Sequence, residues 1–142
     1  MIEAARSSDL QGITGLLERR HLPLAGVVDH LETMLVARDG GRIVGTAGLE
    51  LYADGALLRS VAVDPDAQGR GLGQELTGAA LRLAETHGRE TVFLLTTTAE
   101  GFFPKFGFEI VTRDEVPASV RASVEFQSAC PASAIVMRRR LE

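Results

Sequence analysis

A glycine-rich segment contains the residues whose spacing most clearly suits ligand binding. Gly69, Gly71 and Gly73 alternate with Arg70 and Leu72, directly before a stretch of helical periodicity. Glycine tolerates positive φ and lets a ligand approach the backbone, so consecutive N–H groups can converge on an anion. The free N–H groups and the dipole of the following helix add attraction for phosphate. The segment therefore predicts a phosphate-binding loop.

Two nucleotide-binding loops do not match this segment. No Lys followed by Ser or Thr comes after Gly73, which excludes the Walker loop. The alternation of Gly69, Gly71 and Gly73 also departs from the G-x-G-x-x-G spacing of dinucleotide-binding folds.

The elements around the loop predict an α/β or α+β domain. Apolar periodicity indicates a helix up to about Arg20, a further helix at 72–88 and a short helix at 102–107. Strands are expected at 34–37, 43–52, 57–63, 91–95, 108–111 and 134–137. Asp54-Gly55 is typical of a two-residue hairpin turn. The expected order is an antiparallel meander, then a strand–loop–helix–strand unit. Residues 113–131 give no clear pattern.

Composition limits the classes of function. The chain has 142 residues, which predicts one domain over 1–142. A net charge of −4 argues against a basic nucleic-acid-binding surface. No run approaches the roughly 18 apolar residues of a membrane span, and the first residues do not resemble a secretory signal. We therefore expect a cytoplasmic protein. The single Cys130 excludes a metal site built from several thiolates, and no metal site is predicted.

The loop and its surroundings resemble the GNAT superfamily of N-acetyltransferases. The run from Gln68 to Gly73, after Val61-Ala62-Val63, is similar to that superfamily's acyl-CoA-binding motif Gln/Arg-x-x-Gly-x-Gly/Ala. Residues 102–108 resemble its closing Phe-Tyr-x-Lys-x-Gly-Phe segment, and the likeness covers residues 43–111. It implies a mixed, mostly antiparallel sheet with helices on both faces. Two strands of that sheet would splay apart to form a cofactor notch.

The resemblance also implies a cofactor and a direct-transfer mechanism. Acetyl-CoA would be the co-substrate, and the backbone N–H of Val61 would stabilise the oxyanion at the thioester. The residues implied for coenzyme A are Val61, Ala62, Val63, Gln68, Gly69, Arg70, Gly71, Leu72, Gly73 and Gln74. Many relatives have Tyr where this chain has Phe103, and that Tyr would protonate the leaving thiolate. Here water, one of Thr96 to Thr98, or bulk solvent must serve.

A narrower resemblance concerns the acceptor. Leu22-Pro23-Leu24, residues 94–99, Glu125-Phe126 and residues 130–133 look like the arsenic-resistance N-acetyltransferases, and more distantly like the acetyltransferase domain of N-acetylglutamate synthases. Both imply a small amino-acid-like amine as acceptor, with Thr96 and Thr97 among its contacts. With one cysteine, arsenite binding through thiols is not expected. An arsenic link would therefore run through an organic amine.

The resemblance to the GNAT superfamily implies that one face of the strand at residues 57–63 looks into the acceptor pocket, and a charged pair is expected there. A turn at Asp54-Gly55 would place Glu50 opposite Arg59, and alternation would put Leu57, Arg59 and Val61 on one face. Arg59 could grip a substrate carboxylate in bidentate fashion. Glu50 could hold Arg59, or accept the amine proton through water. The alternative is a cross-strand ion pair worth under ~1 kcal/mol.

Other functions remain open at this stage. A non-catalytic acyl-CoA-binding sensor is favoured by the missing Tyr, and a peptide or protein N-terminal acetyltransferase would keep the cofactor. Residues 113–131 suggest a lid over the cleft, which favours a small acceptor. Exposed edge strands favour a homodimer.

Overall fold

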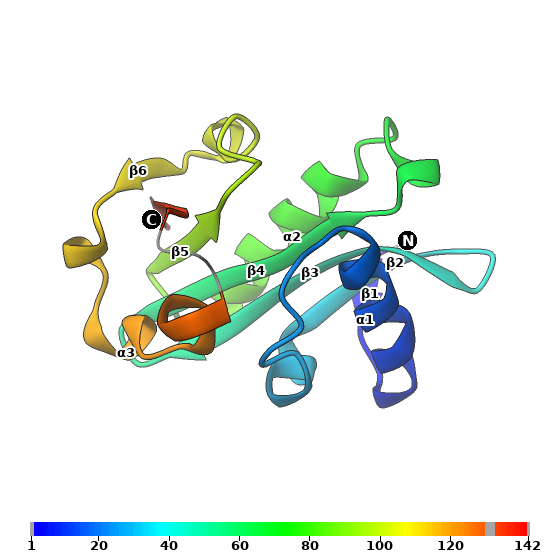
Figure 1. Cartoon of the computed structure of the whole chain (residues 1–142), viewed down its shortest axis with the longest axis horizontal. Coiled ribbons are helices and arrows are strands. Elements are labelled where there is room, and N and C mark those ends of the chain that lie inside the picture. The colour runs from blue at the N-terminus through cyan, green and yellow to red at the C-terminus, as the bar shows by residue number, and fades with distance from the viewer. Residues whose placement is uncertain (1, 130–132, 142) are drawn as a thin grey trace.

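The fold is built on one seven-stranded sheet with the strand order β1-β2-β3-β4-β5-β7-β6. The computed structural model describes residues 2–129 and 133–141, so Cys130 and Pro131 lie outside the described residues. The strands are β1 (Ile2–Ala4), β2 (Met34–Asp39), β3 (Arg42–Tyr52), β4 (Gly55–Val63), β5 (Thr91–Thr96), β6 (Glu109–Val111) and β7 (Ile135–Arg140). All pairs are antiparallel except β4 with β5. The predicted fold class is confirmed (Figure 1).

The two long helices cover opposite faces of the sheet (Figure 1). Helix α1 (Leu10–Arg19) packs through Ile13, Leu16 and Leu17 against β2 and β3, and helix α2 (Leu72–Thr86) packs its own apolar side on the other face. Neighbouring residues of β2 enter different cores, Val36 on the α1 side and Ala37 on the α2 side. This is the alternation expected of a strand buried on both faces. No helix among the described residues is long and apolar enough to cross a membrane.

The β3–β4 hairpin differs from the predicted register. Tyr52 pairs with Gly55, so Ala53 and Asp54 are the turn residues and Glu50 faces Leu57 rather than Arg59. A Cβ on Gly55 would lie 3.2 Å from the Phe93 ring. Glycine at this position therefore allows β5 to pack closely against β4, and it is not one of the turn residues. Because the register differs from the prediction by two residues, Glu50 and Arg59 still lie on the same face of the hairpin.

A β-bulge interrupts β4 near its end. Arg59 pairs with Gly48 but Ala62 pairs with Thr46, so Ser60 and Val61 together oppose Ala47. Ser60 has a positive φ of 58°. Beyond the bulge, Val61 packs with the α2 core, as Leu58 does, whereas Leu57 belongs to a core on the opposite face. The expectation that Val61 shares a face with Leu57 and Arg59 is therefore wrong, because the extra residue inverts the alternation.

Strands β4 and β5 splay apart as the resemblance implied. They pair only at Ala56 with Val92 and at Leu57 with Phe93, although β4 continues to Val63 and β5 to Thr96. Over its last residues, the edge of β4 that faces β5 therefore pairs with no strand of the described residues. This divergence opens the sheet where the glycine-rich loop begins.

The segment after β6 consists of short helices. They are a 3₁₀ turn (Arg113–Glu115), α3 (Ala118–Arg121) and a π-helical turn (Glu125–Ala129), and further 3₁₀ turns occur at Ser7–Asp9, Val28–Thr33, Pro65–Ala67 and Phe103–Phe106. Val116 and Val120 pack against Leu57 and Phe93 of the sheet. This anchors the segment beside the splayed strands.

Candidate active site

A cleft of about 1190 Å³ occupies the gap between β4 and β5. Its walls come from the end of α1, the bulged part of β4, the glycine-rich loop, the end of β5 and the Phe102-Phe103 turn. The lining residues are 20–23, 58–63, 68–69, 71–74, 94–99, 101–103, Glu125 and Ala134. All the predicted site residues except Glu50 and Arg70 therefore lie along one cavity.

The glycine-rich end of the cleft, formed by residues 69–74, presents backbone N–H groups that have no acceptor among the described residues. The first helical bond runs from Glu75 N–H to the Gly71 carbonyl. Gly69 and Gly71 have φ of +87° and +77°, and a Cβ on either would meet nothing within 4 Å. Open backbone donors at the start of a 15-residue helix suit an anion.

Asp64 fixes the start of the loop. Its buried carboxylate accepts the Asp66 N–H at 3.0 Å and contacts Arg19 at 3.3 Å and Arg42 at 3.2 Å. The Asp66 N–H, followed by the two arginines, holds the pKa of the Asp64 carboxyl below its ordinary value despite burial. Asp64 therefore ties the end of β4 to α1 and to β3.

Arg70 points away from the cleft. Its guanidinium forms an exposed ion pair with Asp39 at 3.1 Å, and the side chain is absent from the cleft lining. At this end of the cleft Arg70 therefore presents its backbone N–H, while its side chain contacts Asp39 at the end of β2. Gln68 differs, since its amide donates to the Val63 carbonyl at 3.3 Å inside the cleft wall.

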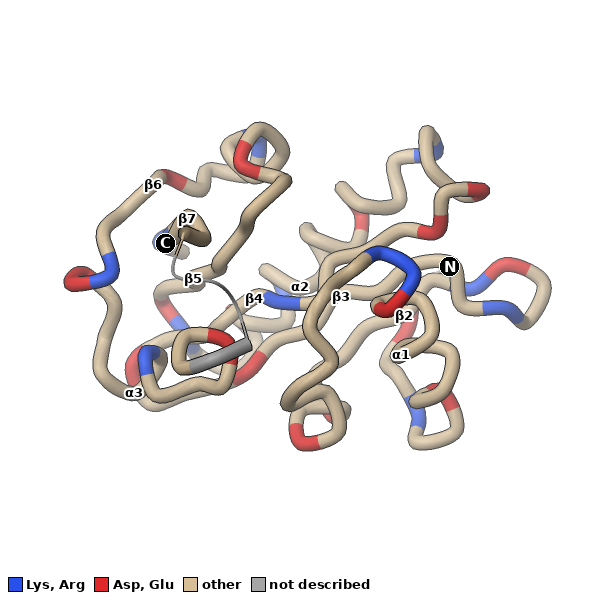
Figure 2. Tube along the Cα trace, in the orientation of Figure 1, with Lys and Arg blue, Asp and Glu red and all other residues tan. Residues whose placement is uncertain are grey.

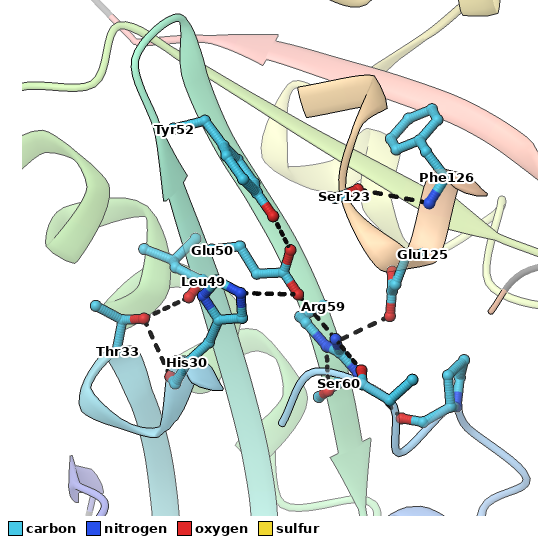
Figure 3. A network of polar contacts seen from close by, with 12 residues as sticks. His30, Thr33, Leu49, Glu50, Tyr52, Arg59, Ser60, Ser123, Glu125 and Phe126 are labelled. Carbon is cyan, nitrogen blue, oxygen red and sulfur yellow. Dashed lines mark hydrogen bonds and ion pairs between the residues drawn. The ribbon is translucent and has the colours of Figure 1, made fainter. Parts of the chain in front are cut away.

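A polar cluster lies at the other end of the cleft (Figure 3). We define it as Glu50, Tyr52, Arg59, Ser60 and Glu125. Arg59 Nη1 donates to Glu50 Oε2 at 2.8 Å, and Arg59 Nε lies 3.4 Å from Glu125 Oε2. The side chains of Glu50 and Arg59 are 0% and 1% exposed, so their ion pair is fully buried. The predicted contact between them exists, as a diagonal pair across the hairpin.

Most N–H groups of the Arg59 guanidinium donate hydrogen bonds to the protein itself. Nε donates to Ser60 Oγ at 3.0 Å, Nη1 to the Ala25 carbonyl at 2.5 Å as well as to Glu50, and Nη2 to the Pro23 carbonyl at 3.1 Å. Counting acceptors among the described residues, four of its five N–H groups are used and one is left for a ligand, fewer than a bidentate grip requires. A contact between Arg59 and an acceptor therefore stays a prediction, whereas its structural role is observed.

Glu50 and Tyr52 are held behind this arginine. The Tyr52 hydroxyl donates to Glu50 Oε1. The pKa of Tyr52 is raised mainly by burial and, to a smaller extent, by the Glu50 carboxylate. His30 Nε2 lies 3.7 Å from Glu50 Oε2. Neither Glu50 nor Tyr52 lines the cleft, so Glu50 approaches it only through Arg59.

The wall opposite β4 has few polar side chains. Phe103 lines the cleft with its ring packed on Phe102 and Phe108. Thr96 Oγ1 accepts the Ala99 N–H at 2.9 Å, whereas Thr97 is exposed at the rim.

Several cleft residues were not singled out from the sequence as site residues. Arg20 and His21 reach the cleft from the end of α1, where His21 has a φ of +58°. Ser60 enters through the bulge, for which the sequence carries no local signal. Glu125 enters from the π-helical turn. Basic and acidic residues are interspersed along the trace (Figure 2), and no group of His, Cys, Asp and Glu within residues 2–129 and 133–141 is arranged to hold a metal.

Comparison with known proteins establishes the class. The model of the acetyltransferase (GNAT) domain family matches residues 30–110, more than half of the chain, and the chain belongs to this family.

Individual relatives extend the likeness beyond the matched residues. The amino-acid acetyltransferase of Neisseria meningitidis serogroup A is 28% identical over 149 residues, covering 97% of this chain and 33% of that protein. The amino-acid acetyltransferase of Mycobacterium tuberculosis is 36% identical over 81 residues, covering 56% of this chain and 46% of that protein. The chain thus spans about a third to a half of the length of these curated relatives.

Solved structures show the same fold over the whole chain. N-acetylglutamate synthase from Neisseria gonorrhoeae, complexed with coenzyme A and N-acetyl-glutamate, superposes with a TM-score of 0.86 at 26% identity, covering 100% of this chain and 35% of that one. Rv2747 from Mycobacterium tuberculosis, solved with coenzyme A, superposes with a TM-score of 0.85 at 25% identity, covering 100% of this chain and 99% of that one.

Proposed function

We propose that this chain is an N-acetyltransferase that moves the acetyl group of acetyl-CoA to the primary amine of a small amino-acid-like acceptor. The observation that carries the proposal is the row of N–H groups over residues 69–74 that have no acceptor among the described residues, together with the stretch of β4 before them that is not paired with β5. A pyrophosphate fits the first feature, and a pantetheine arm fits the second. Two of the solved relatives were crystallised with coenzyme A, which supports this ligand.

In this proposal the cofactor is bound mostly by backbone. The N–H groups from Gly69 to Gln74 hold the pyrophosphate beside Gln68, and the free edge of β4 at Val61, Ala62 and Val63 pairs with the pantetheine arm. The N–H of Val61 then stabilises the oxyanion that forms on the thioester carbonyl. These donors stand in place before the ligand arrives, so little reorganisation is needed.

The acceptor amine occupies the polar end of the cleft, beside Thr96 and Thr97. Its nitrogen attacks the thioester carbon; the C–N bond forms, the C–S bond breaks, and the electron pair stays on sulfur. The buried ion pair supports Glu50 as the group that holds Arg59 in place. Arg59 in turn fixes the wall at Pro23 and Ala25 against the sheet.

The names of the relatives favour an amino acid as the acceptor. An organic arsenical amine is a second acceptor of the same chemical class, suggested by the narrower resemblance.

The direct test is an acceptor screen. The chain is incubated with acetyl-CoA and, one at a time, with the amino acids, an amine-bearing organoarsenical and a peptide with a free N-terminus. Free thiol and the acetylated product are then measured. We expect thiol release that depends on a small amine. Binding of acetyl-CoA without turnover on any amine would indicate a sensor instead, and turnover on the peptide alone would indicate a peptide acetyltransferase.

A further inference from the structure

Ser60 has an unusual backbone conformation at the cleft. In the described part of the chain, Ser60 and His21 are the two non-glycine residues with a positive φ. A left-handed conformation is unfavourable for a residue with a Cβ and persists where the surrounding structure enforces it. At Ser60 the β4 bulge enforces it, and the 8%-exposed residue lines the cleft.

The Ser60 hydroxyl is polarised, and its hydrogen has no acceptor among the described residues. Ser60 Oγ accepts the Arg59 Nε–H at 3.0 Å (Figure 3). No residue within 2–129 or 133–141 accepts a hydrogen bond from Ser60 Oγ. A cationic donor on the oxygen makes the O–H a better donor in turn. Arg59 is itself fixed by Glu50 and two carbonyls, so the hydroxyl is held in a defined position.

The position of Ser60 along β4 corresponds to the reacting end of the cofactor. The loop that would hold the pyrophosphate follows the C-terminal end of β4, so an arm running back along the strand passes Val63 before Val61. The thioester then lies beside residues 60 and 61. Phe103, on the opposite wall, has no hydroxyl. Thr96 Oγ1 also accepts an N–H, but from the neutral backbone of Ala99 rather than from a guanidinium, so its hydroxyl is less polarised than that of Ser60.

We propose that the Ser60 hydroxyl donates a hydrogen bond to the coenzyme A sulfur as the thiolate departs. The inference rests on the proposed function. When the C–S bond breaks, the electron pair remains on sulfur and Ser60 keeps its proton while bonding to that charge. The proton lost by the new amide nitrogen passes to solvent, and solvent later protonates the thiolate. Ser60, polarised by Arg59, thereby takes the stabilising part for which this chain has no tyrosine at Phe103.

The test compares the binding of coenzyme A with that of desulfo-coenzyme A by calorimetry, which needs no acceptor. Wild type should prefer the sulfur-containing ligand by roughly 3- to 10-fold, and more at pH 9 than at pH 7, since a thiolate accepts more strongly. Ser60→Ala and Ser60→Gly should bind the two ligands equally. Ser60→Gly adopts the positive φ without strain, so it separates loss of the hydroxyl from loss of stability.

Thr98→Ala, which removes another hydroxyl from the cleft rim, should keep the wild-type preference. A preference retained in both Ser60 variants, or lost equally in Thr98→Ala, would overturn the assignment to Ser60. If wild type binds both ligands without preference, this inference fails while the proposed cofactor stands. If wild type binds neither, both fail.

Discussion

The two ends of the cleft are built in opposite ways. At the glycine-rich end, the backbone N–H groups of residues 69–74 have no acceptor in the part of the chain that the structure describes. At the other end, Arg59 has four hydrogen bonds to the protein and almost no exposed surface. The hydrogen-bond donors of the first end are available to a ligand, whereas most donors of Arg59 are already bonded to the protein.

This difference separates binding by backbone from positioning by side chains. A backbone loop recognises a phosphate through glycines and a helix start, with little dependence on distant residues. The polar cluster instead joins β3, β4, the segment at Pro23–Ala25 and the π-helical turn. Changes in the glycine-rich loop should therefore alter cofactor affinity, and changes at Glu50, Tyr52 or Arg59 should alter stability.

The largest effect is expected for Arg59→Ala. Removing the guanidinium leaves the Glu50 carboxylate buried without its cation, so the free energy of unfolding should fall by about 3–5 kcal/mol. Urea unfolding measures it. Arg70→Ala removes an ion pair of similar length whose partners are more than half exposed, and it should cost under about 1 kcal/mol. Equal losses in the two variants would contradict the contrast between the buried cluster and the surface.

Gly26 tests how tightly Arg59 is packed. Gly26 has a φ of +85°, and its Cβ would lie 2.9 Å from Arg59 Nη1 and 3.0 Å from Val124. Gly26→Ala should therefore add overpacking of about 1–3 kcal/mol to the strain of about 1–2 kcal/mol at positive φ. Gly40→Ala, at φ +60° with nothing within 4 Å, should show the strain alone. Thermal unfolding of both variants gives the difference, and equal melting temperatures would mean that the guanidinium is loosely held.

Gly71→Val tests whether the glycine-rich end of the cleft binds the cofactor. Its side chain has room in the fold but would stand where the pyrophosphate approaches the backbone, at a φ of +77°. We expect acetyl-CoA affinity to fall at least tenfold, about 1.4 kcal/mol, measured by calorimetry. Gly40→Val carries comparable strain outside the cleft lining and should bind acetyl-CoA as wild type does. Unchanged affinity in Gly71→Val would show that this loop does not hold the cofactor.

The smallest effect concerns pH. The Asp66 N–H, Arg42 and Arg19 lower the pKa of the Asp64 carboxyl in the folded state. A lowered folded-state pKa gives stability that is present above the unfolded value of about 3.9 and is lost as pH falls toward the folded value. The free energy of unfolding should therefore decline below about pH 4, and Asp64→Asn should decline less steeply. Unfolding curves at pH 3 and pH 6 would show this, and parallel declines in the two proteins would exclude Asp64 as a contributor.

The sequence determined the elements whose signals are local. Apolar periodicity predicted α1 and α2, and the glycine-rich run predicted the loop between β4 and α2, because a helix start and a positive-φ glycine depend on few neighbours. The opposite charges at Glu50 and Arg59 also indicated their contact, since a hairpin keeps one face in common even when its register shifts by two. The family likeness over residues 43–111 supplied the splay of β4 and β5.

Tertiary structure decided the rest of the site. Gly55 lies beside Phe93 rather than in the turn, and the bulge at Ser60 moves Val61 to the other face; both depend on neighbouring strands that a local pattern does not contain. The turns between Arg113 and Ala129 have too little periodicity of their own, and they are fixed by packing on Leu57 and Phe93. Whether Arg59 is free for a ligand depended on carbonyls about 35 residues away along the chain. A side chain's unused donors are known only when all its neighbours are in place, whereas a backbone loop presents its donors through its own conformation.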